Sequence, residues 1–438
     1  MWTWPQTLPL IQHQSIPLIT SLLVAFTPAT SPLRGPTAAL LFALACSVQF
    51  NAQTYLAGTR ISGPIAATCW ISVLNAVDLL VLSRFSFCSE TATTTITTTS
   101  SASSISSITT DSNGSNGVIS ANGTTKEKTT PKHPSNTTST STSTSSNALK
   151  KYLSALSLTF NFRRIATPHQ IHCLPRPATT SKTHFLLTST LKLLVAVCLV
   201  QLSTLETSDE YLTRAVAKLP LEPKTILFPF LGGHPGARNL WLRVLFTVSF
   251  GVVCRASVVA GYTLPAVLGV GLEVYGVEMW PDVDGGLVEG WSVGRFWGLA
   301  WHQTLRQVLT TNADFLASVL RISPSWRRYF RLVFAFTVSG VVHLLMDVGF
   351  GVSIEKSGAL LFFVLQVLGI VLETVVVVVS APVRDRMPLW MRRGVGYAWV
   401  AAFMVWTAPV WINPILVQLY SDGVRMMSPF LGFGGWDI

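Results

Sequence analysis

The chain has 438 residues, of which only 12% are Asp, Glu, Lys or Arg, about half of the share that is usual in soluble globular proteins. It also contains 14 Trp and 23 Phe, and its mean hydropathy is +0.47. These values exclude a soluble fold, whose surface needs more charge, and predict an integral membrane protein. The net charge of +11 does not indicate nucleic-acid binding, because the basic residues lie in short clusters beside apolar runs, as expected for cytosolic loops of a membrane protein.

None of the six cysteines belongs to a CxxC pair, which argues against a zinc site and a disulfide framework.

Eight apolar runs are long enough to cross a bilayer, which takes about 20 residues. In chain order they cover 8–28, 35–50, 61–82, 185–202, 240–269, 329–349, 358–380 and 396–419. We therefore expect an all-α integral membrane protein with about eight transmembrane helices. The N-terminal residues carry no basic segment, so we expect no cleaved signal peptide.

A long polar stretch separates the third run from the fourth. Between Thr91 and Ser146, 33 of 56 residues are Ser or Thr, so this stretch has too little apolar surface to fold and is expected to be disordered. We therefore expect three parts: N-terminal transmembrane helices over 1–86, a disordered cytosolic loop over 87–149, and a region with five further transmembrane helices over 150–438.

Three clusters of basic residues indicate the orientation in the membrane. They lie at 150–164, before the fourth run, at 321–331, before the sixth, and at 384–393, after the seventh. If all eight runs span the bilayer, the three clusters are on one side, which the positive-inside rule assigns to the cytosol. Both termini are then expected in the lumen.

The first polar motif lies between the fifth and sixth runs. On a helix with 100° per residue, Arg295, His302 and Arg306 would fall within about 20° of one direction. Trp297 and Trp301 would lie on the opposite side. The segment is too polar to span, so it predicts an amphipathic helix at the cytosolic interface. Its two cations and imidazole suit a phosphorylated carrier; the alternative is a peripheral helix whose arginines bind lipid headgroups.

The second polar motif lies inside the sixth run, where Phe336, Ser339, Gly340, His343 and Asp347 share one helical face. His343 is about 18 Å along the axis from the last arginine before it, which places it near the middle of the bilayer. A neutral imidazole there is suited to remove a proton from a hydroxyl group, and Asp347, one turn away, could fix its tautomer. Gly340 permits close approach of a helix or a ligand. The alternative is a structural histidine that bonds to a neighbouring helix.

Other polar residues occur within the apolar runs. We expect each of them to be a hydrogen-bond partner between helices rather than a catalyst. They are Asn75, Asp78, Lys192, Gln366 and Glu373.

The two motifs together resemble the wax-synthase-like branch of the membrane-bound O-acyltransferase superfamily, especially its fungal members. The first motif matches an F-W-G-x-x-W-H-Q segment that begins at Phe296, and the second matches an F-x-x-S-G-x-x-H helix that begins at Phe336. Weaker similarities lie at 163–168, at 280–281 and between Gln366 and Glu373. The resemblance runs from about residue 150 to the C-terminus.

The resemblance implies acyl transfer from a coenzyme A (CoA) thioester to a hydroxyl group, with acyl-CoA as co-substrate and no bound cofactor or metal. His343 would be the catalytic base, and His302 would orient the reactants or stabilise the oxyanion. Supporting residues would be Asp347, Ser339 and Gln303. The acyl-CoA would bind at Arg295, Arg306, Trp297 and Trp301.

Fungal members of this branch acetylate terpenoid or meroterpenoid alcohols, so the resemblance favours an acetyl-CoA-dependent enzyme of the endoplasmic reticulum with a hydrophobic alcohol as acceptor. A long-chain wax ester or sterol ester synthase is the alternative. A proton-coupled transporter that uses the intramembrane His and Asp is a more distant alternative, because the chain contains no internal repeat.

Overall fold

The computed structural model describes residues 3–88, 143–171, 174, 181–203, 210–229 and 237–424. Met1–Cys88 and Lys151–Ile438 form one compact unit, and Ser89–Lys150 form the other. The disordered loop expected over 87–149 lies outside the described residues except at its ends, and its last residues begin a helix, α4 (Ser143–Phe160). Within the described ranges every regular element is a helix.

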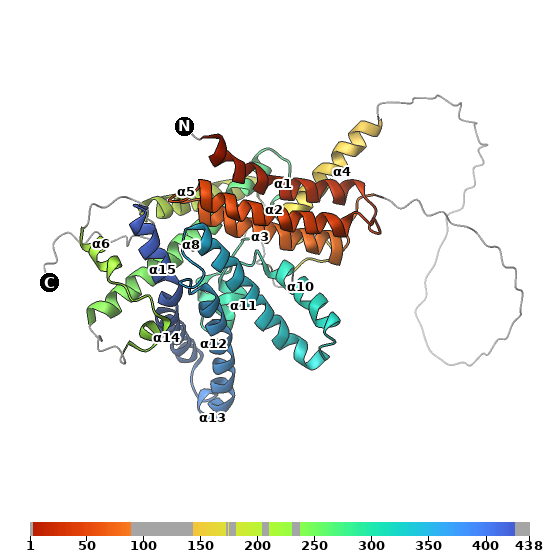
Figure 1. Ribbon diagram of the computed structural model, residues 1–438. Helices are drawn as coiled ribbons and strands as arrows, with labels where there is room; N and C mark the ends of the chain where they lie inside the picture. The colour runs from red at the N-terminus through yellow and green to blue at the C-terminus, as the bar shows by residue number, and fades with distance from the viewer. Residues whose placement is uncertain are drawn as a thin grey trace, which may run out of the picture. The chain divides into compact units, whose positions relative to one another are not determined.

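The N-terminal part of the chain forms a layer of three neighbouring helices (Figure 1). They are α1 (Trp4–Phe26), α2 (Arg34–Tyr55) and α3 (Ser62–Val77), which continues through a π turn, η1 (Asp78–Leu82). On α2, Ala45, Val48 and Ala52 are fully buried in this layer. The two alanines let helix backbones approach closely, which strengthens packing where lipid is the solvent.

The rest of the chain carries the long helices of the core and several short turns between them. In chain order these elements are α5 (Lys182–Leu202), α6 (Glu210–Ala217), α7 (Pro223–Leu227), α8 (Ala237–Gly271), η3 (Val277–Met279), η4 (Leu287–Glu289), α9 (Val293–Arg295), η5 (Phe296–Ala300), α10 (Arg306–Val319), α11 (Pro324–Gly349), α12 (Ala359–Val379), α13 (Ala381–Arg384), α14 (Leu389–Thr407) and α15 (Pro409–Ser421).

Seven helices of the described chain are long and apolar enough to cross a membrane: α1, α2, α3 with η1, α5, α8, α11 and α12. The pair α14 and α15 meets the same criterion together, but it is bent by 47°, with Pro409 at the start of the second helix. These elements coincide with the eight expected runs, so the prediction of about eight transmembrane helices is confirmed, with seven single helices and the bent pair as the eighth candidate. The chain is an all-α, multi-pass membrane protein.

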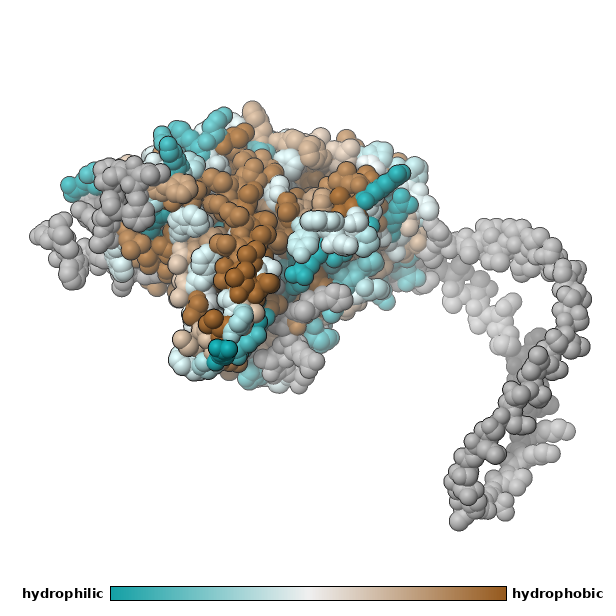
Figure 2. Space-filling view, turned by 90° about the horizontal axis from the view of Figure 1, so that it is seen from below, coloured by the Kyte–Doolittle hydropathy of each residue, from teal (hydrophilic) through white to brown (hydrophobic). Residues whose placement is uncertain are grey.

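The outer faces of the spans are apolar. Figure 2 shows large brown areas of hydrophobic side chains on one face of the molecule. On α5, for example, Leu187, Leu191 and Leu194 are exposed at fractions between 58% and 70%. Such exposure is unfavourable in water but expected where the solvent is lipid.

Two arginines of the first basic cluster are buried rather than on the surface of a loop. Arg164 is fully buried; it forms an ion pair with Asp78 and donates to Oδ1 of Asn75 at 2.8 Å. Arg163 donates to the carbonyl oxygens of residues 281 and 282, each at 2.6 Å. These arginines fix the loop to α3 and its π turn and to the 281–282 segment. The positive-inside argument counted them as charges of an ordinary surface loop, and the structure shows that they are buried. Asn75, which also donates to the carbonyl of Thr159 in α4 at 2.8 Å, is a partner between helices as expected, whereas Asp78 pairs with an arginine of the connecting loop.

Candidate active site

His343 lies in the C-terminal half of α11, where its own helix fixes the ring. Its Nδ1 is 2.7 Å from the carbonyl oxygen of Ser339. Because a carbonyl oxygen can only accept a hydrogen bond, Nδ1 carries the proton and Nε2 keeps its lone pair. A half-buried imidazole in this tautomer has the free nitrogen that a general base needs.

Two aromatic rings from other helices enclose the imidazole. Phe363 of α12 lies tilted against it with ring centroids 4.7 Å apart, and Trp411 of α15 meets it at 86° with centroids 4.9 Å apart. Gly340 of α11 makes the approach of α12 possible, since a Cβ atom there would lie 3.0–3.2 Å from atoms of Leu360 and Phe363. The close approach expected at Gly340 is therefore confirmed.

Asp347 is fully buried, but its hydrogen bonds go to residues other than His343. Its carboxylate accepts a bond of 3.0 Å from Nε1 of Trp411 and one of 2.6 Å from the hydroxyl of Ser357. The expectation that Asp347 holds the ring of His343 in one tautomer is therefore wrong, because the carbonyl of Ser339 has that role. The carboxylate instead fixes the indole that packs against the ring.

The segment that carries His302 is not the continuous amphipathic helix that its periodicity predicts. The single turn of α9 passes into the π turn η5, which ends at Trp301 in an extended conformation with ψ of 169°. A regular helix resumes only with α10, at Arg306. The expected common face of Arg295, His302 and Arg306 is therefore wrong.

Backbone hydrogen bonds to a distant segment interrupt this helix. The N–H of Gly285 donates to the carbonyl of Leu299, and the N–H of Gln303 donates to the carbonyl of Val283, each at 3.0 Å. Gly285 is needed for this approach, since a Cβ atom there would lie 2.2 Å from the Leu299 oxygen. His302 is thus held between two residues that are anchored to the 283–285 segment.

His302 is an electrostatic neighbour of His343. Its ring is half-buried, and its Nδ1 is a buried atom without a hydrogen-bond partner among the described residues. Burial, and then the neighbouring His343, lower the pKa of His302 from 6.5 to about 4. His302 is therefore neutral at pH 7, and a neutral imidazole can donate one hydrogen bond to a negative charge that develops beside it.

Aromatic residues connect the two motifs. Trp297 donates from Nε1 to Oε1 of Gln366 at 3.1 Å, and its ring lies against Phe363 with centroids 5.8 Å apart. Trp301 stacks on Phe296 with centroids 5.4 Å apart. Trp297 therefore packs in the core beside the second motif, and the expected interhelical role of Gln366 is confirmed.

Comparison with known proteins assigns this region to a family. The model of the "Membrane bound O-acyl transferase family" matches residues 280–365, which include both histidines. Acetyltransferase ataH of Aspergillus terreus is 30% identical over 291 residues, which make up 64% of this chain and 93% of that protein. The chain belongs to the membrane-bound O-acyltransferase family.

Two further relatives of this acyltransferase differ in how much of their length it matches. Acetyltransferase fsoF of Humicola fuscoatra is 29% identical over 404 residues, which are 85% of this chain and 88% of that protein. Acetyltransferase spyB of Aspergillus fumigatus is 30% identical over 199 residues, which are 41% of this chain and only 34% of that protein. The chain thus spans about a third of the length of spyB and most of the length of the other two. No solved structure matches it.

The two arginines of the first motif have different surroundings in this acyltransferase. Arg295 forms an ion pair with Glu289, and its guanidinium carbon lies 4.7 Å from the ring centre of Trp291. Arg306 is exposed and donates to the carbonyl of Gly298 at 3.2 Å. Of the two, Arg306 is the cation without a carboxylate partner in the described part of the chain.

Two polar side chains, the half-buried Glu373 and the buried Gln303, hold or complete the His302 segment. Glu373 of α12 accepts hydrogen bonds from the backbone N–H groups of Val293 at 2.6 Å and Gly294 at 3.3 Å, which confirms its expected role as a partner between elements. Gln303 donates from Nε2 to the carbonyl of Gly298 at 3.4 Å. Its Oε1 is buried without a partner among the described residues, so it can accept a hydrogen bond from a bound molecule.

Sequence reasoning missed three residues that pack against or hold the candidate site. Trp411 and Phe363 lie in strongly apolar runs, where nothing local distinguishes them from other aromatic residues. Arg255 donates to the carbonyl of Ala300 at 3.0 Å and forms an ion pair of 2.7 Å with Asp284. Arg255 could have been found from the sequence, because it is the one charged residue in the middle of the fifth run. Cations inside a membrane span are rare and are usually paired, so this position predicts a carboxylate partner.

Proposed function

We propose that this acyltransferase transfers an acetyl group from acetyl-CoA to a hydroxyl group of a hydrophobic terpenoid or meroterpenoid alcohol. The observation that carries the proposal is the hydrogen bond from Nδ1 of His343 to Ser339, because it leaves Nε2 free as a base. The names of the fungal relatives, all acetyltransferases, support acetyl as the transferred group. The membrane-spanning fold supports an apolar acceptor, which can reach the enzyme through the bilayer.

In the proposed reaction, Nε2 of His343 removes the hydroxyl proton while the alcohol oxygen bonds to the thioester carbonyl carbon. His302 donates a hydrogen bond to the negative oxygen that forms on this carbon. The bond between carbon and sulfur then breaks, and the departing thiolate takes the proton from His343. The products are the acetyl ester and the free thiol of CoA, and both histidines return to their neutral state.

The carrier is proposed to bind at the first motif. Arg306 meets the phosphates of CoA, together with Arg295, whose partly exposed ion pair with Glu289 is weak enough to exchange for a phosphate. Trp297 and Trp301 are proposed to contact the bound acyl-CoA. We place the enzyme in the endoplasmic reticulum membrane, with these arginines on the cytosolic side, where acetyl-CoA is available.

The test uses microsomes that contain the full chain, labelled acetyl-CoA or palmitoyl-CoA, and a panel of terpenoid alcohols. We expect a labelled acetyl ester from the wild type and none from His343→Ala, while His184→Ala, which removes an exposed imidazole of α5, keeps full activity. Both variants should be present in the membrane in equal amounts.

Two outcomes would contradict the proposal. Labelled product from palmitoyl-CoA alone would identify a long-chain ester synthase. Acetyl transfer that persists in His343→Ala would show that another group is the base.

A further inference from the structure

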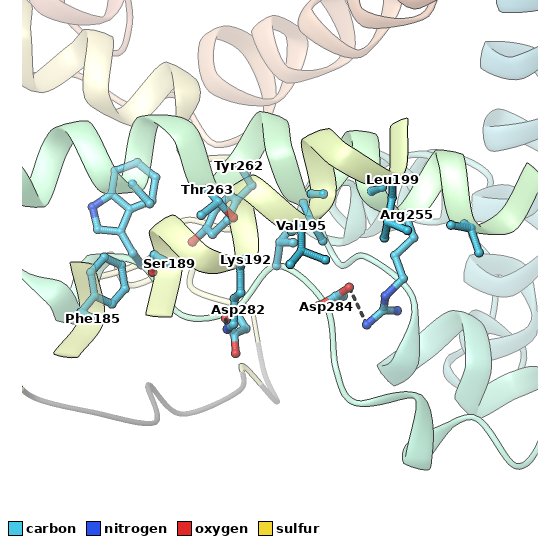
Figure 3. Close-up of a pocket in the computed structure, with 17 residues that line it drawn as sticks. Phe185, Ser189, Lys192, Val195, Leu199, Arg255, Tyr262, Thr263, Asp282 and Asp284 are labelled. Carbon is cyan, nitrogen blue, oxygen red and sulfur yellow. Dashed lines mark hydrogen bonds and ion pairs between the residues drawn. The ribbon is translucent and has the colours of Figure 1, made fainter. Parts of the chain in front are cut away.

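A cavity of about 370 Å³ lies between α5 and α8, with the segment at 280–284 along one side (Figure 3). Most of its wall is apolar and comes from side chains such as Val195, Leu199 and Val259. The cavity is separate from the histidine pair. Its lining includes neither His302 nor His343. The residue of α8 that packs against Trp411, beside His343, is Phe250, which is not part of the lining; the ring centroids of Phe250 and Trp411 are 4.8 Å apart.

The charged groups in the lining are paired with one another. Nζ of Lys192 is 2.7 Å from Asp282, and Nη2 of Arg255 is 2.7 Å from Asp284. Two cations and two carboxylates cancel, so the described lining offers no excess charge to an anion such as CoA. The lining therefore favours an uncharged occupant.

Three other polar groups of the lining are unpaired. The side chains of Ser189 and Thr263 are 7% and 6% exposed, and neither makes a hydrogen bond with a described residue. Figure 3 shows them on α5 and α8, respectively. Nε1 of Trp280, also in the lining, is buried without a partner in the described chain. Because buried polar groups are nearly always hydrogen-bonded, these three groups suit a bound molecule that carries oxygen atoms.

We propose that this cavity is a second binding site, for an uncharged, oxygenated, apolar molecule of terpenoid or sterol size. Its volume lies within the range of small-molecule sites, its wall matches an apolar body, and its unpaired donors match a hydroxyl or ester oxygen. Such a molecule can come from the reaction, as the acceptor alcohol or its ester, or from the bilayer, as a sterol. Only the first of these sources rests on the proposed function.

The site also touches the segment that positions His302. Arg255 of the lining donates to the carbonyl of Ala300, and Val283 of the lining accepts from the N–H of Gln303. A molecule in the cavity therefore rests against the residues that hold both ends of the Ala300–Gln303 turn.

The experiment is photolabelling of the full-length protein in phosphatidylcholine nanodiscs. The probe is a C15 isoprenoid alcohol that carries a diazirine and an alkyne, and a matched hydrocarbon probe lacks the hydroxyl group. Labelled peptides are mapped by mass spectrometry. We expect the alcohol probe to label α5 or α8 at residues of the cavity, and to do so equally in His343→Ala, because binding here does not need catalysis.

Variants of the lining test the two halves of the proposal. Ala256→Phe fills the cavity and should abolish the labelling, whereas Ala401→Phe, on the exposed face of α14, should leave it unchanged. The near-isosteric pair Ser189→Ala and Thr263→Val keeps the apolar wall and removes the hydroxyls. Because two hydrogen bonds are lost, it should reduce labelling by the alcohol about tenfold and leave labelling by the hydrocarbon unchanged.

Competition identifies the source of the ligand. Displacement of the probe by farnesol or farnesyl acetate supports the proposal with a molecule of the reaction as ligand, and displacement by ergosterol supports it with a bilayer sterol. The proposal is overturned if the label maps elsewhere, or if the hydrocarbon labels as well as the alcohol and the double variant changes neither. If the cavity is labelled but no alcohol is ever acetylated, the second site stands and the proposed function fails.

Discussion

The two histidines of this acyltransferase are positioned in opposite ways. His343 is fixed by a carbonyl four residues earlier in its own helix, so its orientation depends mainly on local structure. His302 lies in a break between helices and depends on contacts from Gly285, Val283 and Glu373, which are 17 to 71 residues away in the chain. The hydrogen bond that sets the tautomer of His343 thus depends on its own helix alone, whereas His302 can be displaced through several remote contacts.

The largest effect is expected at the proposed base. In His343→Ala the proposed acceptor of the hydroxyl proton is lost, so kcat for the proposed acetyl transfer should fall by about 10²–10⁴-fold, the range that general-base catalysis contributes. The KM for acetyl-CoA should change little. If kcat fell less in His343→Ala than in His302→Ala, the proposed roles of general base and oxyanion donor would have to be exchanged.

His302→Ala should have the next largest effect. Removing one hydrogen-bond donor to an oxyanion costs about 10²–10³-fold in kcat. Steady-state kinetics of the purified enzyme would measure it, and His302→Asn, which restores a donor, should recover part of the activity. No recovery with any donor side chain would mean that His302 acts by packing alone.

Gly285→Ala tests whether remote contacts position His302. The added methyl group would collide with the carbonyl of Leu299, so the 299–303 turn must shift. A displacement of about 1 Å in an active site can cost about 10²-fold in rate, and we expect a loss of about 10- to 100-fold in kcat. Gly286→Ala is the matched control, because a Cβ atom there has its nearest neighbour at 4.0 Å and should be tolerated. Equal activities of the two variants would contradict the dependence of His302 on the 283–285 segment.

Asp347→Asn should have a smaller effect, because it acts on His343 only through Trp411. The amide oxygen can still accept from the indole, while the charge-assisted bond from Ser357 is weakened. We expect a fall in kcat of about threefold to tenfold, since a net hydrogen bond to a charged group contributes about 1.5–3 kcal/mol and only part of it is lost. Asp347→Ala, which leaves Nε1 of Trp411 unpaired, should be markedly worse in both kcat and thermal stability.

The smallest effect concerns pH. The lowered pKa of His302, about 4 instead of 6.5, means that this ring stays unprotonated until the pH approaches 4. Between pH 5 and pH 8, therefore, His302 should not change its charge, and the residual activity of His302→Asn should follow the same pH profile as the wild type. If kcat of the wild type changed with pH near 6.5 and kcat of His302→Asn did not, His302 would titrate there, which would contradict the prediction.

The sequence predicts well what depends on local pattern. The apolar runs locate every span of the described chain, because the thickness of the bilayer sets their length. Spacing along a regular helix also places Gly340, His343 and Asp347 on one side of α11, and the small residue there does admit α12.

The same reasoning fails where tertiary contacts decide the local structure. Periodicity alone makes the His302 segment helical, but the backbone of 283–285 binds residues 299 and 303 and interrupts the helix. Asp347 lies one turn from His343, yet its carboxylate binds Trp411, 64 residues further along the chain. Burial of Arg163 and Arg164 is equally invisible in a cluster that resembles an ordinary cytosolic loop.

The buried pair of Arg164 and Asp78 has a consequence for biogenesis. The two partners are 86 residues apart, and Asp78 belongs to a span that is synthesised first. At about 5–20 residues per second, the ribosome needs roughly 4 to 17 s to reach the arginine after it has made the carboxylate. During that interval Asp78 lacks its arginine partner, so the ion pair that fixes the loop to the third span forms only after the loop has emerged.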